Sequence, residues 1–174
     1  LITYASLIIG ELVPKQIALR DPEGVAVKVA PAMTVLARIG EYDEALRLYE
    51  QLLREYPLQA KIWMSHGHAL KTAGRRPDCI AAYARSIELS PSLGEAWWSL
   101  ANLKTYRFAQ TEVETMRSQL AQEGLPAEDR LHLHFALGKA LEDAGEHAAA
   151  FEHYAEGNRL RRAELPYRAE ETTA

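Results

Sequence analysis

The pattern of polar and apolar residues changes at Gly40. After this residue no stretch sustains an alternation with a period of two, and the helix formers Ala, Leu, Glu and Arg dominate. A half-buried strand requires such alternation, so the sequence predicts only helices from Gly40 onward. Before Gly40, apolar residues stand at helical spacing across Val25–Ile39, and one more helix is expected there in spite of Pro31.

A set of small, aromatic and proline residues returns after 34 residues. The matching pairs are Gly40 and Gly74, Ala45 and Cys79, Tyr49 and Tyr83, Pro57 and Pro91, and Trp63 and Trp97. The pattern returns once more with Gly138, Gly145, Ala150 and Tyr154. Gly145 lies 71 residues after Gly74, which is two periods of 34 plus three. About three residues are therefore inserted in the intervening repeat, either in Tyr106–Gln110 or around Gly124–Asp129.

A period of 34 with these residue types resembles the tetratricopeptide repeat (TPR). The resemblance implies helical hairpins that stack, because one hairpin alone cannot bury its apolar face. It predicts an all-α fold, a right-handed α–α solenoid of about 3.5–4 repeats. The expected segments are residues 1–39, which supply the first helix of repeat one, a TPR domain over residues 40–163, and a tail over residues 164–174.

Each residue class has an expected place in these hairpins. Small residues are expected where the two helices of a hairpin touch: Gly67, Ala101 and Gly138 on the first helices, and Ala45, Cys79 and Ala150 on the second. Large aromatic residues are expected between neighbouring hairpins: Trp63, Trp97, Tyr49, Tyr83 and Tyr154, with His147 at another such position. Proline cannot continue a helix, so Pro57 and Pro91 should end the second helices. Repeat three departs from the pattern, since its second helix, predicted over Thr111–Gln122, lacks the usual tyrosine.

Residues 1–39 resemble a different family, the membrane domain of CorC-like (CNNM) transport proteins. The resemblance rests on the motif Gly10-Glu11-Leu12-Val13-Pro14-Lys15, followed by Ala18-Leu19, Pro22-Glu23 and Ala30-Pro31. It implies that the acidic residue of the motif, Glu11, helps to bind a transported cation in that family. Here one carboxylate stands without converging oxygen ligands, so no metal site is predicted. The abrupt change of family after Ile39 suggests a fusion of unrelated sequences.

An alternative interpretation makes the same segment a structural part of the repeat stack. Terminal repeats expose an apolar face unless something covers it. Apolar residues of Leu1–Leu19 could cover that face, or could mediate a dimer through residues 1–39. Glu11 would then be an ordinary carboxylate without a metal.

Composition and motifs speak against catalysis and against several kinds of ligand. Twenty basic and 24 acidic residues give a net charge of −4, which does not favour nucleic acid. The single cysteine, Cys79, is consistent with a reducing compartment, and a cytoplasmic location is expected. The pairs His66/His68 and His132/His134 have a spacing of two, which points the rings to opposite sides of a helix. We predict no catalytic residue, no cofactor and no metal.

A further resemblance concerns Trp97–Phe108 and Glu128–Ala163. Both are similar to the TPR region that precedes the catalytic domain of bacterial TPR-sulfotransferase proteins. The resemblance implies a parent enzyme that uses the sulfate donor PAPS, whose phosphate loop does not occur in these 174 residues. The chain would then be the substrate-recognition part of that enzyme. A fragment of a membrane cation transporter is a further alternative.

The preferred function is a scaffold that binds a protein or peptide in the concave groove of the TPR stack. In this family the first helix of each hairpin lines the groove. By this count repeat two contributes Lys61, Met64, Ser65, His68 and Lys71, repeat three contributes Trp98, Ser99, Asn102, Thr105 and Tyr106, and repeat four contributes His132, Phe135, Lys139 and Glu142. Asn102 can bond to an extended backbone, while the lysines could engage acidic groups.

Overall fold

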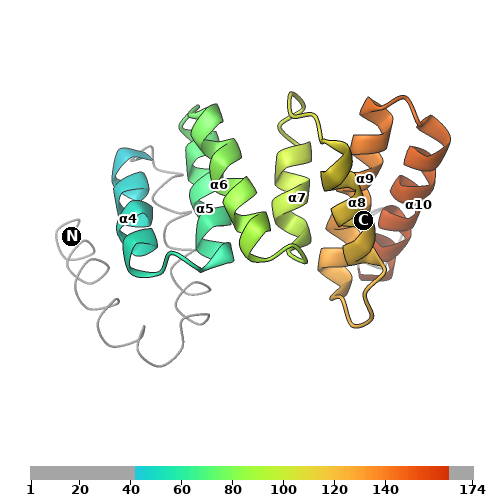
Figure 1. The fold of residues 1–174 in the computed structure, drawn as a ribbon, viewed down its shortest axis with the longest axis horizontal. Coiled ribbons are helices and arrows are strands. Elements are labelled where there is room, and N and C mark those ends of the chain that lie inside the picture. Colours follow the sequence, from blue (N-terminus) through green and yellow to red (C-terminus); the bar gives the residue numbers. More distant parts are fainter. Residues whose placement is uncertain (1–41, 165–174) are drawn as a thin grey trace, which may run out of the picture. The chain divides into compact units, whose positions relative to one another are not determined.

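The computed structural model describes residues 42–164, and this part of the chain is all-α. Its helices are α4 (Tyr42–Glu55), α5 (Ala60–Thr72), α6 (Arg76–Leu89), α7 (Gly94–Ala101), α8 (Gln110–Leu120), α9 (Ala127–Asp143) and α10 (His147–Glu164). No strand occurs among the described residues, as the sequence predicts. The helices follow one another with short connections (Figure 1). The helix expected over Val25–Ile39 and the whole segment of residues 1–39 lie outside the described residues.

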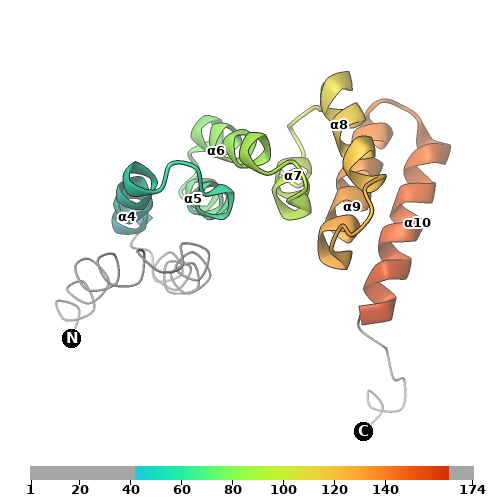
Figure 2. The same cartoon turned by 60° about the horizontal axis from the view of Figure 1, so that its bottom comes forward.

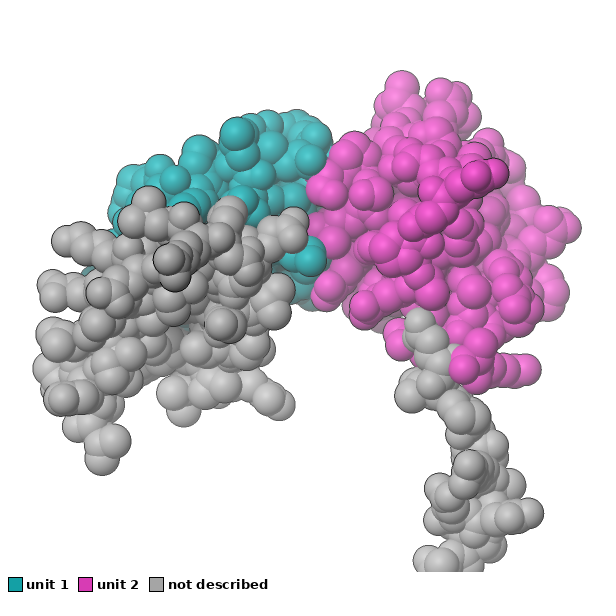
Figure 3. All heavy atoms as spheres, turned by 90° about the horizontal axis from the view of Figure 1, so that it is seen from below, with its two compact units in different colours: residues 1–89 teal, residues 90–174 magenta. Residues whose placement is uncertain are grey.

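The chain divides into two compact units, residues 1–89 and residues 90–174 (Figure 3). In the first unit α5 packs against both α4 and α6. In the second, α9 packs against α7, α8 and α10. Within residues 42–164, each unit therefore contains one closely packed helical hairpin, α5–α6 or α9–α10, with further helices beside it.

Glycine lets the two helices of each of these hairpins approach closely. A Cβ atom built on Gly67 of α5 would lie 2.5 Å from Cε1 of Tyr83 in α6. A Cβ on Gly138 of α9 would lie 2.8 Å from Cδ1 of Tyr154 in α10. The small residues are thus where the repeat predicts them. Tyr83 and Tyr154, however, fill space within their own hairpins, and the expectation that they lie between hairpins is wrong.

The small residues of the second helices are also buried as expected. Ala45 and Cys79 are 0% exposed, and Ala150 is 3% exposed. Burial raises the pKa of the Cys79 thiol. His147, in contrast, is exposed at the start of α10, so its expected position between repeats is not what the structure shows.

The two tryptophans are held in the same way in successive repeats. Nε1 of Trp63 donates to the carbonyl oxygen of Pro57 over 2.8 Å, and Nε1 of Trp97 donates to that of Pro91 over 2.9 Å. Each acceptor lies six residues before its tryptophan, in the turn that precedes the helix. The same turn therefore ends the second helix of one repeat and fixes the first helix of the next.

Repeat three has a shortened first helix. Helix α7 ends at Ala101, and Lys104 just beyond it adopts a left-handed conformation with φ 63°. The loop that follows is held by side chains: the Tyr106 hydroxyl donates to Glu112 Oε1 over 2.7 Å, and Arg107 donates to the carbonyl of Lys104 over 3.1 Å. The second helix of this repeat is α8, two residues shorter at its end than the predicted Thr111–Gln122.

The three inserted residues extend the start of α9. Trp63 and Trp97 each stand three residues after the first residue of their helices, Ala60 and Gly94. His134, which holds the same repeat position, stands seven residues after Ala127, four more than in the other two helices: the three inserted residues and one further residue. The insertion thus lies near Gly124–Asp129, the second of the two sites that the spacing allows, and it adds about one turn to the helix.

Candidate protein-binding surface

Most of the predicted groove residues lie on the first helices of the hairpins, and α9 shows their arrangement most clearly. His132, Phe135, Lys139 and Glu142 stand at steps of three and four and form one stripe along the helix. None of the four is fully buried, since the first three are half-buried and Glu142 is exposed. Leu133 and Leu137, on the other side of the helix, are 0% exposed. The stripe therefore lies on the side of α9 opposite these two leucines and is partly open.

An aromatic pair joins this stripe to α7. The rings of Trp98 and Phe135 have centroids 5.5 Å apart, with their planes tilted by 47°. Both side chains are half-buried. Phe135 also packs against α10 of the same hairpin. Its ring centroid lies 6.4 Å from that of Tyr154, and a Cβ built on Gly157 would lie 3.2 Å from the Phe135 ring. The position of the half-exposed aromatic pair is thus fixed by the packing of Phe135 against α10.

A group of charges lies at the carboxyl end of the α9 stripe. Lys139 forms an ion pair with Asp143, and Arg107 reaches the same carboxylate over 2.9 Å. Glu142 accepts a 2.7 Å hydrogen bond from the Tyr154 hydroxyl. Burial is the main cause of the raised pKa of Tyr154, and the hydrogen bond to Glu142 raises this pKa further. With Glu142 included, the two positive charges of Lys139 and Arg107 are balanced by two carboxylates at this end of the stripe.

Three residues predicted for the groove of repeat three do not lie on its first helix. Asn102 is the C-cap of α7, while Thr105 and Tyr106 belong to the loop that follows. The repeat count assumes a first helix of full length, but the left-handed Lys104 ends it early. Ser99 is on α7 but only 7% exposed, so its hydroxyl is not part of an open surface.

The predicted groove residues of α5 lie in the other unit. Lys61 and Lys71 are exposed, and Ser65 is half-buried. His68 is half-buried, with Nδ1 2.8 Å from the hydroxyl of Tyr83. Met64 is 8% exposed and therefore contributes to the core more than to a surface.

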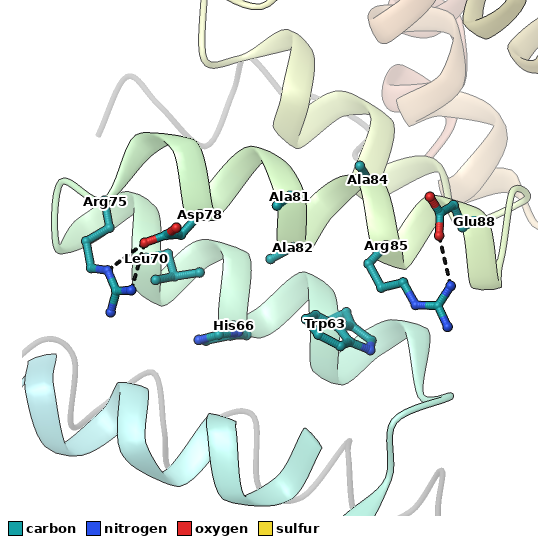
Figure 4. A pocket seen from close by; sticks show the side chains of 10 residues that line it. All are labelled: Trp63, His66, Leu70, Arg75, Asp78, Ala81, Ala82, Ala84, Arg85 and Glu88. Carbon is teal, nitrogen blue, oxygen red and sulfur yellow. Dashed lines mark hydrogen bonds and ion pairs between the residues drawn. The ribbon is translucent and has the colours of Figure 1, made fainter. Parts of the chain in front are cut away.

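A cavity that the repeat pattern did not predict opens beside α5 and α6, with a volume of about 660 Å³. Its lining, drawn in Figure 4, comprises Trp63, His66, Leu70, Arg75, Asp78, Ala81, Ala82, Ala84, Arg85 and Glu88. The charged lining residues are satisfied as the ion pairs Arg75–Asp78 (2.7 Å) and Arg85–Glu88 (2.8 Å).

His66, which lines this cavity, is a buried histidine without a hydrogen-bond partner in the described part of the chain. It is 8% exposed, and neither ring nitrogen has a hydrogen-bond partner among the described residues or is open to solvent. Burial lowers its pKa, so the ring is neutral at pH 7. Since its nitrogens are covered, the imidazole offers the cavity no polar atom.

Two histidines that the sequence did not bring together meet between α9 and α10. Nδ1 of His134 lies 3.0 Å from Nδ1 of His153, and the ring centroids are 5.2 Å apart. Burial lowers the pKa of both rings, and nearby positive charges add to this effect. The pair is separated by 19 residues, so no spacing within one helix could have indicated it.

Within residues 42–164, no cluster of three or more His, Cys, Asp or Glu side chains is arranged to hold a metal ion. No helix in that range is long and apolar enough to cross a membrane.

Comparisons with known proteins agree with these helical hairpins. A family model described as tetratricopeptide repeat matches residues 34–92. The fold of the described helices is of the TPR type. Structures of MamA are similar to it: a crystal structure of MamA has a TM-score of 0.55 and 16% identity, covering 88% of this chain and 87% of that one. A MamA RS-1 double mutant has a TM-score of 0.53 and 14% identity, covering 92% and 96%.

The N-terminal segment matches a second, unrelated family. The model described as cyclin M transmembrane N-terminal domain matches residues 1–41, in agreement with the CNNM resemblance. The UPF0053 protein sll0260 of Synechocystis sp. is 60% identical over 38 residues, which are 22% of this chain and 8% of that protein. Neither family model extends over Glu128–Ala163, so the sulfotransferase resemblance there stays a prediction.

Proposed function

We propose that the chain binds a protein segment on the face formed by α7 and α9, the first helices of the last two repeats. The observation that carries this proposal is the contact between Trp98 and Phe135, an aromatic surface shared by two successive repeats. Large, rigid aromatic side chains supply binding area at a low cost in conformational entropy. They are also enriched among the residues that dominate protein interfaces.

The charges beside the aromatic pair favour a particular ligand chemistry. Lys139 and Arg107 share one carboxylate, Asp143, while Glu142 beside them accepts the hydrogen bond of the Tyr154 hydroxyl. An apolar side chain on the ligand would pack against Trp98 and Phe135, and an acidic group next to it would approach the two cations. The TPR fold supports the general role of a scaffold for protein interactions, and this location is the proposed refinement.

Selection from a random peptide library on the full chain tests the proposal. Selected peptides should contain an apolar residue next to an acidic one, and Trp98→Ala should weaken their binding by about tenfold or more. Leu58→Ala is the matched control, because Leu58 is also a large apolar residue but is 70% exposed in the α4–α5 turn. Circular dichroism on each variant separates lost binding from lost folding. Peptides that bind Trp98→Ala as tightly as the native chain would place the binding face elsewhere.

A second candidate is the substrate-recognition part of a sulfotransferase, supported by the resemblance of Trp97–Phe108 and Glu128–Ala163. In that case the same face would bind the acceptor protein of the parent enzyme. Fusion to a sulfotransferase domain should then direct sulfation to proteins that carry the selected peptides. The candidate fails if Trp98→Ala in the fusion leaves sulfation of such proteins unchanged.

A third candidate, part of a cation transporter, is supported by the match of residues 1–41 to the cyclin M domain. Its specific element would be Glu11, the acidic residue of the family motif. Binding of Mg²⁺ to the full chain, lost in Glu11→Gln, would support this candidate, and its absence would remove it.

A further inference from the structure

The outer face of α10 carries a large apolar side chain at a repeat position that is buried in α4. Phe151 is 71% exposed, whereas Leu46 is 4% exposed. The two positions correspond because each directly follows the small residue of its second helix, Ala150 or Ala45. Helix α5 packs against α4. Figure 2 shows α9 along one side of α10 and no other described helix along the opposite side.

The residues around Phe151 form a continuous exposed line. Ala148, Phe151, Ala155 and Asn158 stand at steps of three, four and three, and all four are exposed. This is the spacing of a seam between two packed helices. Asn158 takes the place that Leu53 holds in α4, where the leucine is 7% exposed. A polar residue at one seam position weakens a helix pair but fixes its register.

The charges on α10 are ordered along the helix. Before Ala155 the only residue of the helix that is charged at pH 7 is Glu152, so this half is net negative. After Ala155, Arg159, Arg161 and Arg162 exceed Glu156 and Glu164 by one charge, so this half is net positive. A second α10 running antiparallel would place the acidic half of each helix beside the basic half of the other. A parallel copy would place like charges side by side, which is unfavourable. Glu152 and Arg159 lie nearly equidistant from Ala155, where two helices can approach closely over the small side chain.

We propose that the chain forms a two-fold dimer in which the α10 helices of two copies pack antiparallel over Phe151. Each Glu152 then lies beside Arg159 of the other copy. Arg159 binds Glu156 through Nε and Nη2 within its own helix. Its remaining N–H groups are available for a second carboxylate. This interface is separate from residues 1–39 and from the peptide-binding face on α7 and α9.

Sedimentation equilibrium of the full chain over a range of concentrations tests the proposal. The native chain should show a monomer–dimer equilibrium. Phe151→Glu should weaken dimerisation by about 100-fold or more, because two phenylalanines leave the interface and each costs about tenfold. The matched control is Leu58→Glu, which places the same charge at an equally exposed leucine and should leave the equilibrium unchanged. Circular dichroism verifies that both variants keep their helices.

A charge exchange tests the antiparallel arrangement. Glu152→Arg alone and Arg159→Glu alone should each weaken the dimer, because each places like charges across the interface. The double variant restores opposite charges in both contacts and should recover most of the lost affinity. A native chain that stays monomeric, a dimer unaffected by Phe151→Glu, or a double variant no better than the single ones overturns the proposal. A dimer that is lost only when residues 1–39 are deleted also overturns it.

Discussion

The hairpins α5–α6 and α9–α10 share a close glycine–tyrosine contact between their helices but differ in the side chains beside it. In both, a glycine of the first helix lies against a tyrosine of the second, Gly67 against Tyr83 and Gly138 against Tyr154. At the repeat position that Trp63 holds in α5, its indole donates to a proline carbonyl. At the same repeat position α9 has His134, which is paired with His153. The close helix contact thus defines the hairpin, and the positions around it are free to carry different chemistry.

The extra turn of α9 explains the difference. The acceptors of Trp63 and Trp97 are carbonyls six residues earlier, in the turn before the helix. Six residues before His134 is Glu128, which lies in the first turn of α9. Its carbonyl is used by the helix itself, so a tryptophan there would lack its partner. At this position the structure has the ring of His134 in contact with that of His153 instead.

The largest expected effect concerns the glycine contacts. Gly67→Ala should lower the free energy of unfolding by about 3 kcal/mol, because its new methyl group would overlap the ring of Tyr83, which is 0% exposed and cannot move. Gly138→Ala should cost only about 1 kcal/mol, since Tyr154 is half-buried and its ring can shift. Urea unfolding followed by circular dichroism measures both. Equal losses would show that the two hairpins are packed alike.

A smaller effect is expected at the neighbouring small residues. Cys79→Leu and Ala150→Leu should each destabilise by about 2 kcal/mol, because both positions are closed by the facing helix. Cys79→Ala is the control and should cost less, since it adds no volume. The thiol of Cys79 should also react slowly with a thiol reagent in the native protein. Rapid labelling would contradict the burial of this face of α6.

The smallest effect is a dependence on pH that belongs to α9–α10. The pKa values of His134 and His153 are lowered in the folded protein from their ordinary 6.5, so the unfolded chain binds more protons below neutrality. Stability should therefore fall as the pH decreases through about 6.5 and stop falling once both rings are protonated in the folded state. Arg130, Arg159 and Arg117 nearby oppose protonation, while Glu156 and Glu152 favour it.

The double variant His134→Gln/His153→Gln should show a shallower loss of stability between pH 7 and pH 5, measured by thermal unfolding. His66→Gln serves as the comparison in α5, where burial alone is the main cause of the lowered pKa. If the double variant keeps the slope of the native chain, the histidine pair does not titrate as its surroundings indicate.

The period of 34 was sufficient to predict the all-α fold, the hairpins and the buried small residues, because helix contacts at Gly67 and Cys79 impose local size limits. The stripe of proposed binding residues on α9 could be counted in the same way, since four residues in one helix keep their relative positions wherever the helix packs. The count was wrong at Asn102, Thr105 and Tyr106 because it assumed that α7 runs its full length. Nothing in the spacing marks Lys104 as the residue that ends it.

What the sequence by itself determined is therefore what depends on neighbours in one helix or on a strict repeat: the helical class, the period and the size of residues at helix contacts. The tertiary structure alone decided which side chains meet across helices. It placed Tyr83 and Tyr154 inside their hairpins, joined His134 to His153, and brought Trp98 to Phe135. These contacts depend on where each helix begins and ends, and that is settled by the loops and by packing rather than by the repeat.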